Sequence, residues 1–347
     1  MADHADADEA SSMDACGLQM HRSQRLSPGA ELYQVQVPRP RSASNEKVSP
    51  AFPTLVLPAS ELARMSAMLP HEELRDALVE WTPALGPFVF FSHQWTSFDH
   101  PDHTGKQFCL MQRAVLDLPQ LLAAGHAEHL KHFGSHKLAR PPAAVGMDEQ
   151  VFVWLDFWSI PQLKESAAHR AAQKLAINSI PDYVSAAALL IVVAPEVVHK
   201  DTSCPCNLVS WQRRGWCRLE QLGFFLKDFR VGARLRILVL QAGDLDANKP
   251  LSTSPLGTAK DLTNQRSSVF NGDFSCCARM HIGLECDKIK LLPLVATIHA
   301  SACARLLEEG DLQTFRRIRA LAWAVFAGME GSDASIHGGL AGMEGSD

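Results

Sequence analysis

Four short apolar runs, each bounded by polar or turn-forming residues, mark the central part of the chain. They lie near residues 88–91, 151–155, 188–194 and 235–240. Uninterrupted apolar runs of this length are typical of strands buried on both faces of a parallel sheet. Segments with the apolar spacing of amphipathic helices separate them, at about 105–124, 164–179 and 215–227. This alternation predicts an α/β fold, in which helices cover both faces of a parallel sheet.

The segments that flank this region have a different pattern. Apolar residues at helical spacing recur before it and again after about residue 285. The last residues carry a Gly-rich heptapeptide repeat, which is too short to bury a core. In chain order we expect a disordered arm at 1–50, a helical lead-in at 51–85, the α/β domain at 86–240, a loop at 241–268, a helical extension at 269–328 and a disordered tail at 329–347.

The stretch from Ser210 to Glu220 carries the most informative side chain. Gly215 is a natural break before a helix, and Glu220 then shares a helix face with Trp216, one turn before it. A carboxylate beside an apolar stripe is costly unless a cleft, a partner or a function accounts for it. An ion pair with Arg213 or Arg214 is the simpler explanation, and a functional carboxylate is the alternative.

Composition and charge narrow the class of protein. Of 347 residues, 46% are hydrophobic and 20% charged, which is ordinary for a globular protein. A formal net charge of −5 gives no basic footprint for nucleic acid or an anionic membrane. The N-terminus lacks the features of a signal peptide, and no apolar run approaches the length of a membrane span. We therefore expect a cytoplasmic protein whose nine cysteines are mostly thiols.

Four sequence blocks in this order resemble Toll/interleukin-1 receptor (TIR) domains and fungal heterokaryon-incompatibility (HET) domains. Residues 88–95, Phe-Val-Phe-Phe-Ser-His-Gln-Trp, resemble the first strand of both families. Residues 154–162 resemble the Trp-x-Asp-x-x-x-Ile-x-Gln block of the HET type. Residues 180–193 are similar to the helix and strand that follow in both, and Trp-Cys-Arg-Leu-Glu at 216–220 matches the Trp-Cys-x-x-Glu of plant-type TIR domains.

The resemblance implies a flavodoxin-like α/β fold, self-association and, in some members, cleavage of the nicotinamide–ribose bond of NAD. By position, Glu220 would be the catalytic glutamate, facing a ribosyl centre with oxocarbenium character. NAD would be the substrate, and neither a cofactor nor a metal ion is implied. The residues expected to line the substrate pocket at the ends of the strands are Ser92, His93, Trp95, Asp156, Phe157 and Trp216.

Two functions follow from this resemblance. The first is an intracellular signalling or self-recognition module that acts by TIR-like oligomerisation with its own copies or with related domains. The alternative is an NAD glycohydrolase that uses Glu220. A Rossmann-type oxidoreductase is disfavoured because no Gly-x-Gly-x-x-Gly follows the first strand. For self-association, we expect Trp158 and Ile160 in a surface loop to provide an apolar contact.

Clusters of possible metal ligands and nucleophiles have simpler explanations. Asp and His residues between 93 and 103 are expected to form a polar loop, and the histidines between 126 and 136 a solvated one. Cys276, Cys277, His281 and Cys286 offer four zinc ligands, but adjacent cysteines fit the usual spacing poorly. Cys217 is expected to be a core thiol rather than a nucleophile. We therefore expect no metal site.

Overall fold

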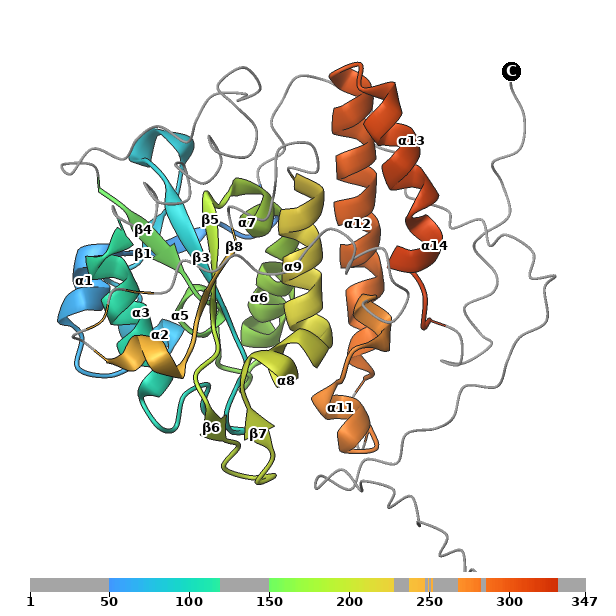
Figure 1. Cartoon of the computed structure of the whole chain (residues 1–347). Helices are drawn as coiled ribbons and strands as arrows, with labels where there is room; N and C mark the ends of the chain where they lie inside the picture. Colours follow the sequence, from blue (N-terminus) through green and yellow to red (C-terminus); the bar gives the residue numbers. More distant parts are fainter. Residues whose placement is uncertain are drawn as a thin grey trace, which may run out of the picture.

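A mixed six-stranded sheet forms the centre of the protein in the computed structural model, which describes residues 50–118, 150–227, 237–246, 249, 251, 268–281 and 285–329. Its strand order is β2-β1-β4-β3-β5-β8, and the four strands from β4 to β8 run parallel to one another (Figure 1). All four coincide with apolar runs in the sequence, so the predicted parallel sheet is confirmed. The parallel strands are β3 (Phe88–His93), β4 (Phe152–Trp154), β5 (Leu189–Val193) and β8 (Ile237–Leu240).

The lead-in expected to be helical over 51–85 also contributes two strands, so that expectation was wrong in part. β1 (Leu55–Pro58) runs antiparallel to β4, and β2 (Val79–Glu80) pairs with β1 at the edge of the sheet. Residues 55–57 are all apolar, and a short run of this kind suits a buried strand as well as a helix. The helical pieces of this segment are α1 (Ala59–Arg64), α2 (His71–Leu74) and the 3₁₀ turn η1 (Pro83–Leu85).

Helices cover both faces of the sheet because side chains alternate along each strand. In β3, Val89 and Phe91 belong to the hydrophobic core on the face of α1, α2, α3 and α5, whereas Phe88 and Phe90 belong to the core beneath α6, α7 and α9. Figure 1 shows the same two helical layers on opposite sides of the strands. The helices of these layers are α3 (Lys106–Leu116), α5 (Asp156–Ser159), α6 (Ala167–Asn178), α7 (Ile180–Ala186), α8 (Leu208–Arg213) and α9 (Gly215–Lys227).

The C-terminal extension is helical, as expected, and forms an additional layer outside α9. α12 (Asp287–Glu308) contributes Leu291, Leu294 and Ile298 to the core that also contains α9. The remaining elements here are η6 (Val269–Asn271), α11 (Ser275–Ala278), α13 (Leu312–Ala320) and α14 (Ala322–Val325). Among the described helices, α12 alone is long and apolar enough to cross a membrane, but 44% of its apolar window is buried inside the protein. That burial fits a helix of the protein core.

Several sequence predictions fall outside the described residues. They concern the arm at 1–49, the tail at 330–347, most of the loop at 241–268 and the histidines between 126 and 136. The described part of that loop contains η4 (Ala242–Leu245). A separate two-stranded sheet, β6 (Val197–Val198) with β7 (Pro205–Cys206), lies between β5 and α8 in the sequence.

Candidate functional site

The candidate site lies where the order of the parallel strands reverses. β3 comes first in the sequence, β4 lies on one side of it and β5 on the other. In open α/β sheets, ligands bind outside the carboxyl ends of the strands at such a reversal. Ser92 and His93 are the last two residues of β3, and Asp156 begins α5 shortly after the end of β4. Three of the predicted pocket residues therefore lie together at the carboxyl end of the parallel strands.

Alternation along β3 directs Ser92 toward α9. The hydroxyl of Ser92 donates a short hydrogen bond to Oε2 of Glu220, and it accepts one from the indole N–H of Trp211 at 3.0 Å. Ser92 is completely buried, and Trp211 lies in α8 directly before α9. Because an indole N–H can only donate, the Ser92 oxygen accepts from Trp211, and its single proton is left to donate to Glu220.

Glu220 is partly buried on α9 and carries a strongly shifted pKa. Burial, helped by the negative charge of Asp156, raises the pKa of Glu220 to about 8, although the hydrogen bond from Ser92 and the charge of His93 act in the opposite direction. The carboxyl group therefore holds its proton at neutral pH. The ion pair with Arg213 or Arg214 that the sequence also allowed is not formed, because Arg213 pairs with Asp273 at 3.0 Å and Arg214 donates to Ser275.

His93 points to the opposite face of the sheet and forms a buried ion pair. Its Nε2 lies 2.9 Å from Oδ1 of Asp156, and its Nδ1 lies 2.9 Å from Oε1 of Gln107 on α3. The amide nitrogen of Gln107 donates to the carbonyls of Gln94 and Pro101, which leaves its oxygen to accept from His93. Both ring nitrogens of His93 therefore donate, and the ring is an imidazolium.

The pKa directions of this pair agree with its hydrogen bonds. Burial alone would lower the pKa of His93, but the charge of Asp156 and the hydrogen bonds to Asp156 and Gln107, together with the charge of Glu220, outweigh burial and raise it. Burial would also raise the pKa of Asp156, but His93 and the indole N–H of Trp95 hold that pKa below its usual value. The two charges thus stabilise each other, and both act electrostatically on Glu220.

Two aromatic residues predicted for the pocket support Asp156. The indole N–H of Trp95 donates to Oδ2 of Asp156 at 2.9 Å. Trp95 also meets the ring of Phe157 edge to face, with centroids 5.8 Å apart, and His100 packs against the same ring. The structure therefore brings Trp95, Phe157 and Asp156 together, and Phe157 is a buried support for the other two.

Trp216 and Cys217 have structural roles in this arrangement. The indole N–H of Trp216 donates to Asp287 at the start of α12, so it links α9 to the C-terminal extension and not to Ser92. Cys217 is buried, its Sγ donates to the carbonyl of His93 at 3.5 Å, and burial raises its pKa well above the ordinary thiol value. The expectation of a core thiol is confirmed, whereas the expectation that Trp216 lines the pocket with Ser92 has no support.

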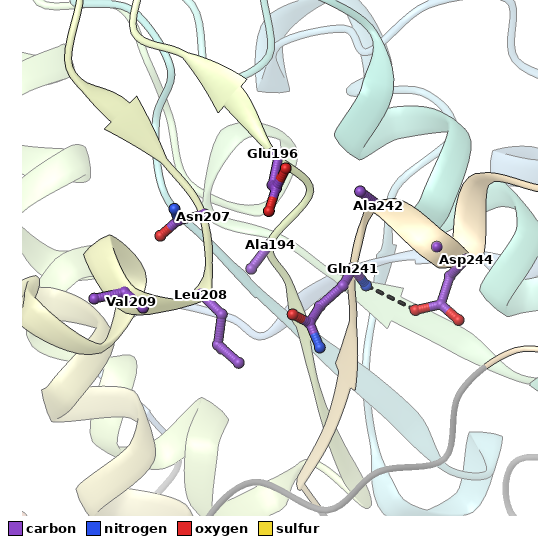
Figure 2. Close-up of a pocket in the computed structure, with 9 residues that line it drawn as sticks. Ala194, Glu196, Asn207, Leu208, Val209, Gln241, Ala242 and Asp244 are labelled. Carbon is purple, nitrogen blue, oxygen red and sulfur yellow. Dashed lines mark hydrogen bonds between the residues drawn. The ribbon is translucent and has the colours of Figure 1, made fainter.

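A pocket of about 460 Å³ opens at the carboxyl ends of β5 and β8 (Figure 2). The start of α8 connects the pocket to the site. The lining residue Asn207 is the N-cap of α8, and its side chain accepts a hydrogen bond from the backbone N–H of Ser210. The hydroxyl of Ser210 in turn donates to Gln94, the residue after β3. The volume is in the range of small-molecule sites. Its lining residues are Ala194, Glu196, Asn207, Leu208, Val209, Gln241, Ala242, Gly243 and Asp244.

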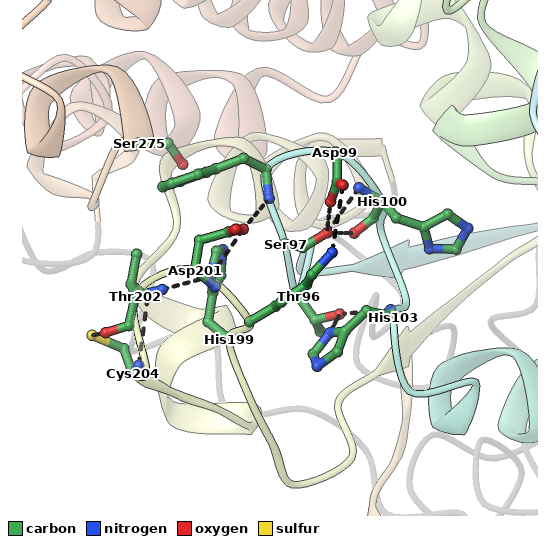
Figure 3. A network of polar contacts seen from close by, with 12 residues as sticks. Thr96, Ser97, Asp99, His100, His103, His199, Asp201, Thr202, Cys204 and Ser275 are labelled. Carbon is green, nitrogen blue, oxygen red and sulfur yellow. Dashed lines mark hydrogen bonds and ion pairs between the residues drawn. The ribbon is translucent and has the colours of Figure 1, made fainter.

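The polar loop after β3 is held by its own hydrogen bonds (Figure 3). Ser97 binds Asp99 and His100, and Thr96 bonds to His103. The backbone N–H of Phe98 donates to Asp201 in the neighbouring loop at 2.7 Å. These contacts agree with the expected polar loop. Among the described residues, the one group of three or more Cys, His, Asp or Glu side chains arranged to hold a metal ion lies elsewhere, at Cys276.

The sequence reasoning missed Trp211 and Gln107. Trp211 lies within the informative stretch from Ser210 to Glu220, but nothing in that stretch indicates which of its tryptophans meets β3. Gln107 is a buried polar residue among apolar positions of α3, and this is the one signal that the sequence offered for it. Trp211 is 119 positions from Ser92 and Gln107 is 14 positions from His93, so both contacts depend on the tertiary arrangement.

No family model, curated protein or solved structure matches this chain. The site joins a protonated carboxyl, a serine hydroxyl whose direction is fixed and an imidazolium–carboxylate pair. Such groups can bind the hydroxyls of a sugar, and the carboxylate form of Glu220 can stabilise a cationic centre.

Proposed function

We propose that the chain cleaves the N-glycosidic bond between nicotinamide and ribose in NAD, with Glu220 as the catalytic carboxylate. The observation that carries this proposal is the burial of Glu220 beside Ser92 at the reversal of strand order, which raises its pKa to about 8. Carboxyl groups whose pKa is strongly raised by burial and by a specific charged neighbour are enriched at functional sites. The resemblance to TIR domains points to the same residue, and the strand order β4-β3-β5-β8 fits a flavodoxin-like fold.

The charge of the substrate fits the state of Glu220. The nicotinamide ring of NAD is a pyridinium cation, and a cation near Glu220 favours the loss of its proton. When the bond between the ribose C1′ and the ring nitrogen breaks, its electron pair goes to the ring, which leaves as neutral nicotinamide. Water then attacks C1′ and releases a proton, giving ADP-ribose. The carboxylate of Glu220 stabilises the positive charge at the ribose during this step.

The remaining groups have supporting roles in the proposal. Ser92, held by Trp211, orients the carboxyl group of Glu220. The His93–Asp156 pair, fixed by Gln107 and Trp95, offers polar groups for ribose hydroxyls at the same edge. The pocket beyond α8 is large enough for another part of the dinucleotide. Self-association remains a prediction from the resemblance alone. Trp158 and Ile160, which were expected at the surface, are both buried, in the two hydrophobic cores on opposite faces of the sheet.

The test is to incubate the purified full chain with NAD and to measure nicotinamide by chromatography. We expect release by the wild type and a loss on the order of a hundredfold or more in Glu220→Gln, which keeps the size of the side chain but cannot ionise to the carboxylate. Glu165→Gln changes an exposed glutamate and serves as the control. A variant Glu220→Gln as active as the wild type would exclude this residue from the mechanism. A wild type inactive at every protein concentration, including conditions that force self-association, would favour the assembly function.

A further inference from the structure

We propose that Cys276, Cys277, His281 and Cys286 bind a structural zinc ion that holds the start of the C-terminal extension against α9. The sulfur atoms of the three cysteines and a ring nitrogen of the histidine all lie within 4.8 Å of one another. This site is independent of the proposed NAD chemistry. The sequence spacing argued against zinc because two of the cysteines are adjacent, but the fold brings all four ligand atoms together.

The distances suit a single ion with tetrahedral coordination. Zinc–sulfur bonds of about 2.3 Å place two sulfur ligands about 3.8 Å apart at the corners of a tetrahedron. The Sγ atoms of Cys276 and Cys277 lie 4.0 Å apart, which is also far too long for a disulfide bond. Three thiolates and one imidazole form a soft ligand set that selects zinc over magnesium or calcium. Four protein ligands complete the coordination shell, as in structural rather than catalytic zinc sites.

The backbone between the ligands has an uncommon conformation that serves this geometry. Met280 and His281 are successive non-glycine residues in the left-handed region, with φ of 53° and 54°. Such residues are uncommon, and here they turn the chain back after α11. The turn lets the N–H of His281 donate to the carbonyl of Cys276 at 2.9 Å. The turn therefore brings the backbone of the histidine back to the first of the two cysteines that precede it.

A supporting hydrogen bond meets one of the sulfurs. The backbone N–H of Asp287 donates to Sγ of Cys276 at 3.3 Å, and such contacts orient and stabilise metal-bound thiolates. Cys286 is the N-cap residue of α12, where the helix dipole favours negative charge. Cys276 is buried, Cys277 and Cys286 are half-buried, and His281 is exposed. The site is thus anchored in the core and remains accessible from solvent.

The ion would join α11, the turn at His281 and the start of α12 beside α9. Phe274, two residues before Cys276, packs against Gly215 at the start of α9. Asp287, one residue after Cys286, accepts the indole N–H of Trp216 in the first turn of the same helix. Figure 1 shows α11 at the end of α12 that lies near α8. Zinc at this point would hold α11 and the first turn of α12 together on the helix that carries Glu220.

The first test measures metal in the full chain purified without chelator, by mass spectrometry of the elements. We expect about one zinc ion per chain, and less than about a tenth of that in Cys277→Ser and Cys286→Ser. Cys303→Ser, which changes a half-buried cysteine of α12 outside the cluster, should keep the ion. Iron or copper in place of zinc would overturn the assignment of the metal. A zinc content equal in the wild type and the cluster variants would overturn the site.

A second measurement needs no variant and so does not depend on folding. Zinc is removed with a chelator under reducing conditions, and cobalt(II) is added in its place. We expect thiolate-to-cobalt charge-transfer absorption and the intense visible bands of tetrahedral cobalt. We also expect hydrogen exchange in the first turn of α9 and in α12 to quicken on zinc removal and to recover on its return. Weak octahedral cobalt bands, or exchange that does not respond to zinc, would contradict a structural zinc site.

Discussion

Ser92 and Glu220 are 128 positions apart in the sequence, and the hydroxyl of Ser92 donates a hydrogen bond to the carboxyl group of Glu220. The contact joins the end of β3 to the middle of α9. It lowers the pKa of Glu220, but burial has the larger effect and leaves that pKa raised to about 8. The protonation of this one carboxyl group therefore depends on how closely α9 packs on the sheet.

The first prediction concerns the pH dependence of NAD cleavage. If the carboxylate form of Glu220 is required, kcat/KM should rise with pH to a plateau, with a midpoint near 8. The pH profile of kcat should have a lower midpoint, because the pyridinium of bound NAD favours the carboxylate form of Glu220. Ser92→Ala removes a hydrogen bond that lowers the pKa and should move both midpoints upward. Steady-state kinetics from pH 6 to 9 check this, and midpoints unaffected by Ser92→Ala would contradict it.

The same carboxyl group makes stability depend on pH. The raised pKa means that the folded chain keeps a proton that the unfolded chain releases, between about pH 4.5 and about pH 8. The contribution of this group to folding is therefore fully present below the lower value and is lost as pH rises through the upper one, with a slope of up to about 1.4 kcal/mol per pH unit. Urea unfolding should show Glu220→Gln gaining stability relative to the wild type as pH rises. A constant difference would contradict the raised pKa.

The third prediction concerns the ion pair between His93 and Asp156. Asp156→Asn should lower the pKa of His93 and destabilise the fold by about 1–3 kcal/mol, because the buried imidazolium loses its charged partner. The raised pKa of His93 means that the pair stabilises the fold below it and ceases to do so as pH rises through it. The gap between wild type and variant in urea unfolding should therefore narrow at alkaline pH. Nuclear magnetic resonance of the His93 ring provides the pKa, and an unshifted pKa would contradict the pairing.

A fourth prediction uses two glycines in different surroundings. A Cβ on Gly215 would overlap the ring of Phe274, whereas one on Gly243 meets no atom within 4 Å. Neither glycine has a positive φ, so the surroundings of the added methyl group are the main difference. Gly215→Ala should destabilise the fold by about 1–3 kcal/mol through overpacking, and Gly243→Ala should be close to neutral. Equal stabilities in thermal unfolding would show that the segment carrying Phe274 does not pack closely on α9.

The fifth prediction reverses the role first expected for Trp158. Its side chain is completely buried between α5 and the sheet, so it cannot serve as an exposed anchor for a second copy. Trp158→Ala should cost about 3–5 kcal/mol of folding stability and should leave the oligomeric state of the folded protein unchanged. Trp323→Ala, at a tryptophan that is 56% exposed, is the matched control and should change stability by less than about 0.5 kcal/mol. Chemical unfolding and light scattering measure the two effects.

The sequence by itself determined the four parallel strands and the helix from Gly215 to Lys227. A continuous apolar run must be covered on both sides, and a central strand of a parallel sheet with helices on both faces meets this need. The same runs also placed Ser92, His93 and Asp156 at the ends of strands, because these polar residues directly follow the apolar ones. The sequence could not separate a strand from a helix over residues 55–57, because so short an apolar run suits both.

Tertiary structure decided which side chains meet. Glu220 pairs with Ser92 instead of the arginines beside it in the sequence, because its face of α9 packs on β3 while Arg213 turns to Asp273. Trp158 follows a strand end as a loop residue would, yet α5 forms there and buries it. The cysteines near 276 have an unfavourable spacing for zinc, but a left-handed turn at Met280 and His281 gathers their ligand atoms. Such contacts depend on backbone turns and packing between distant segments, which local patterns of residues do not encode.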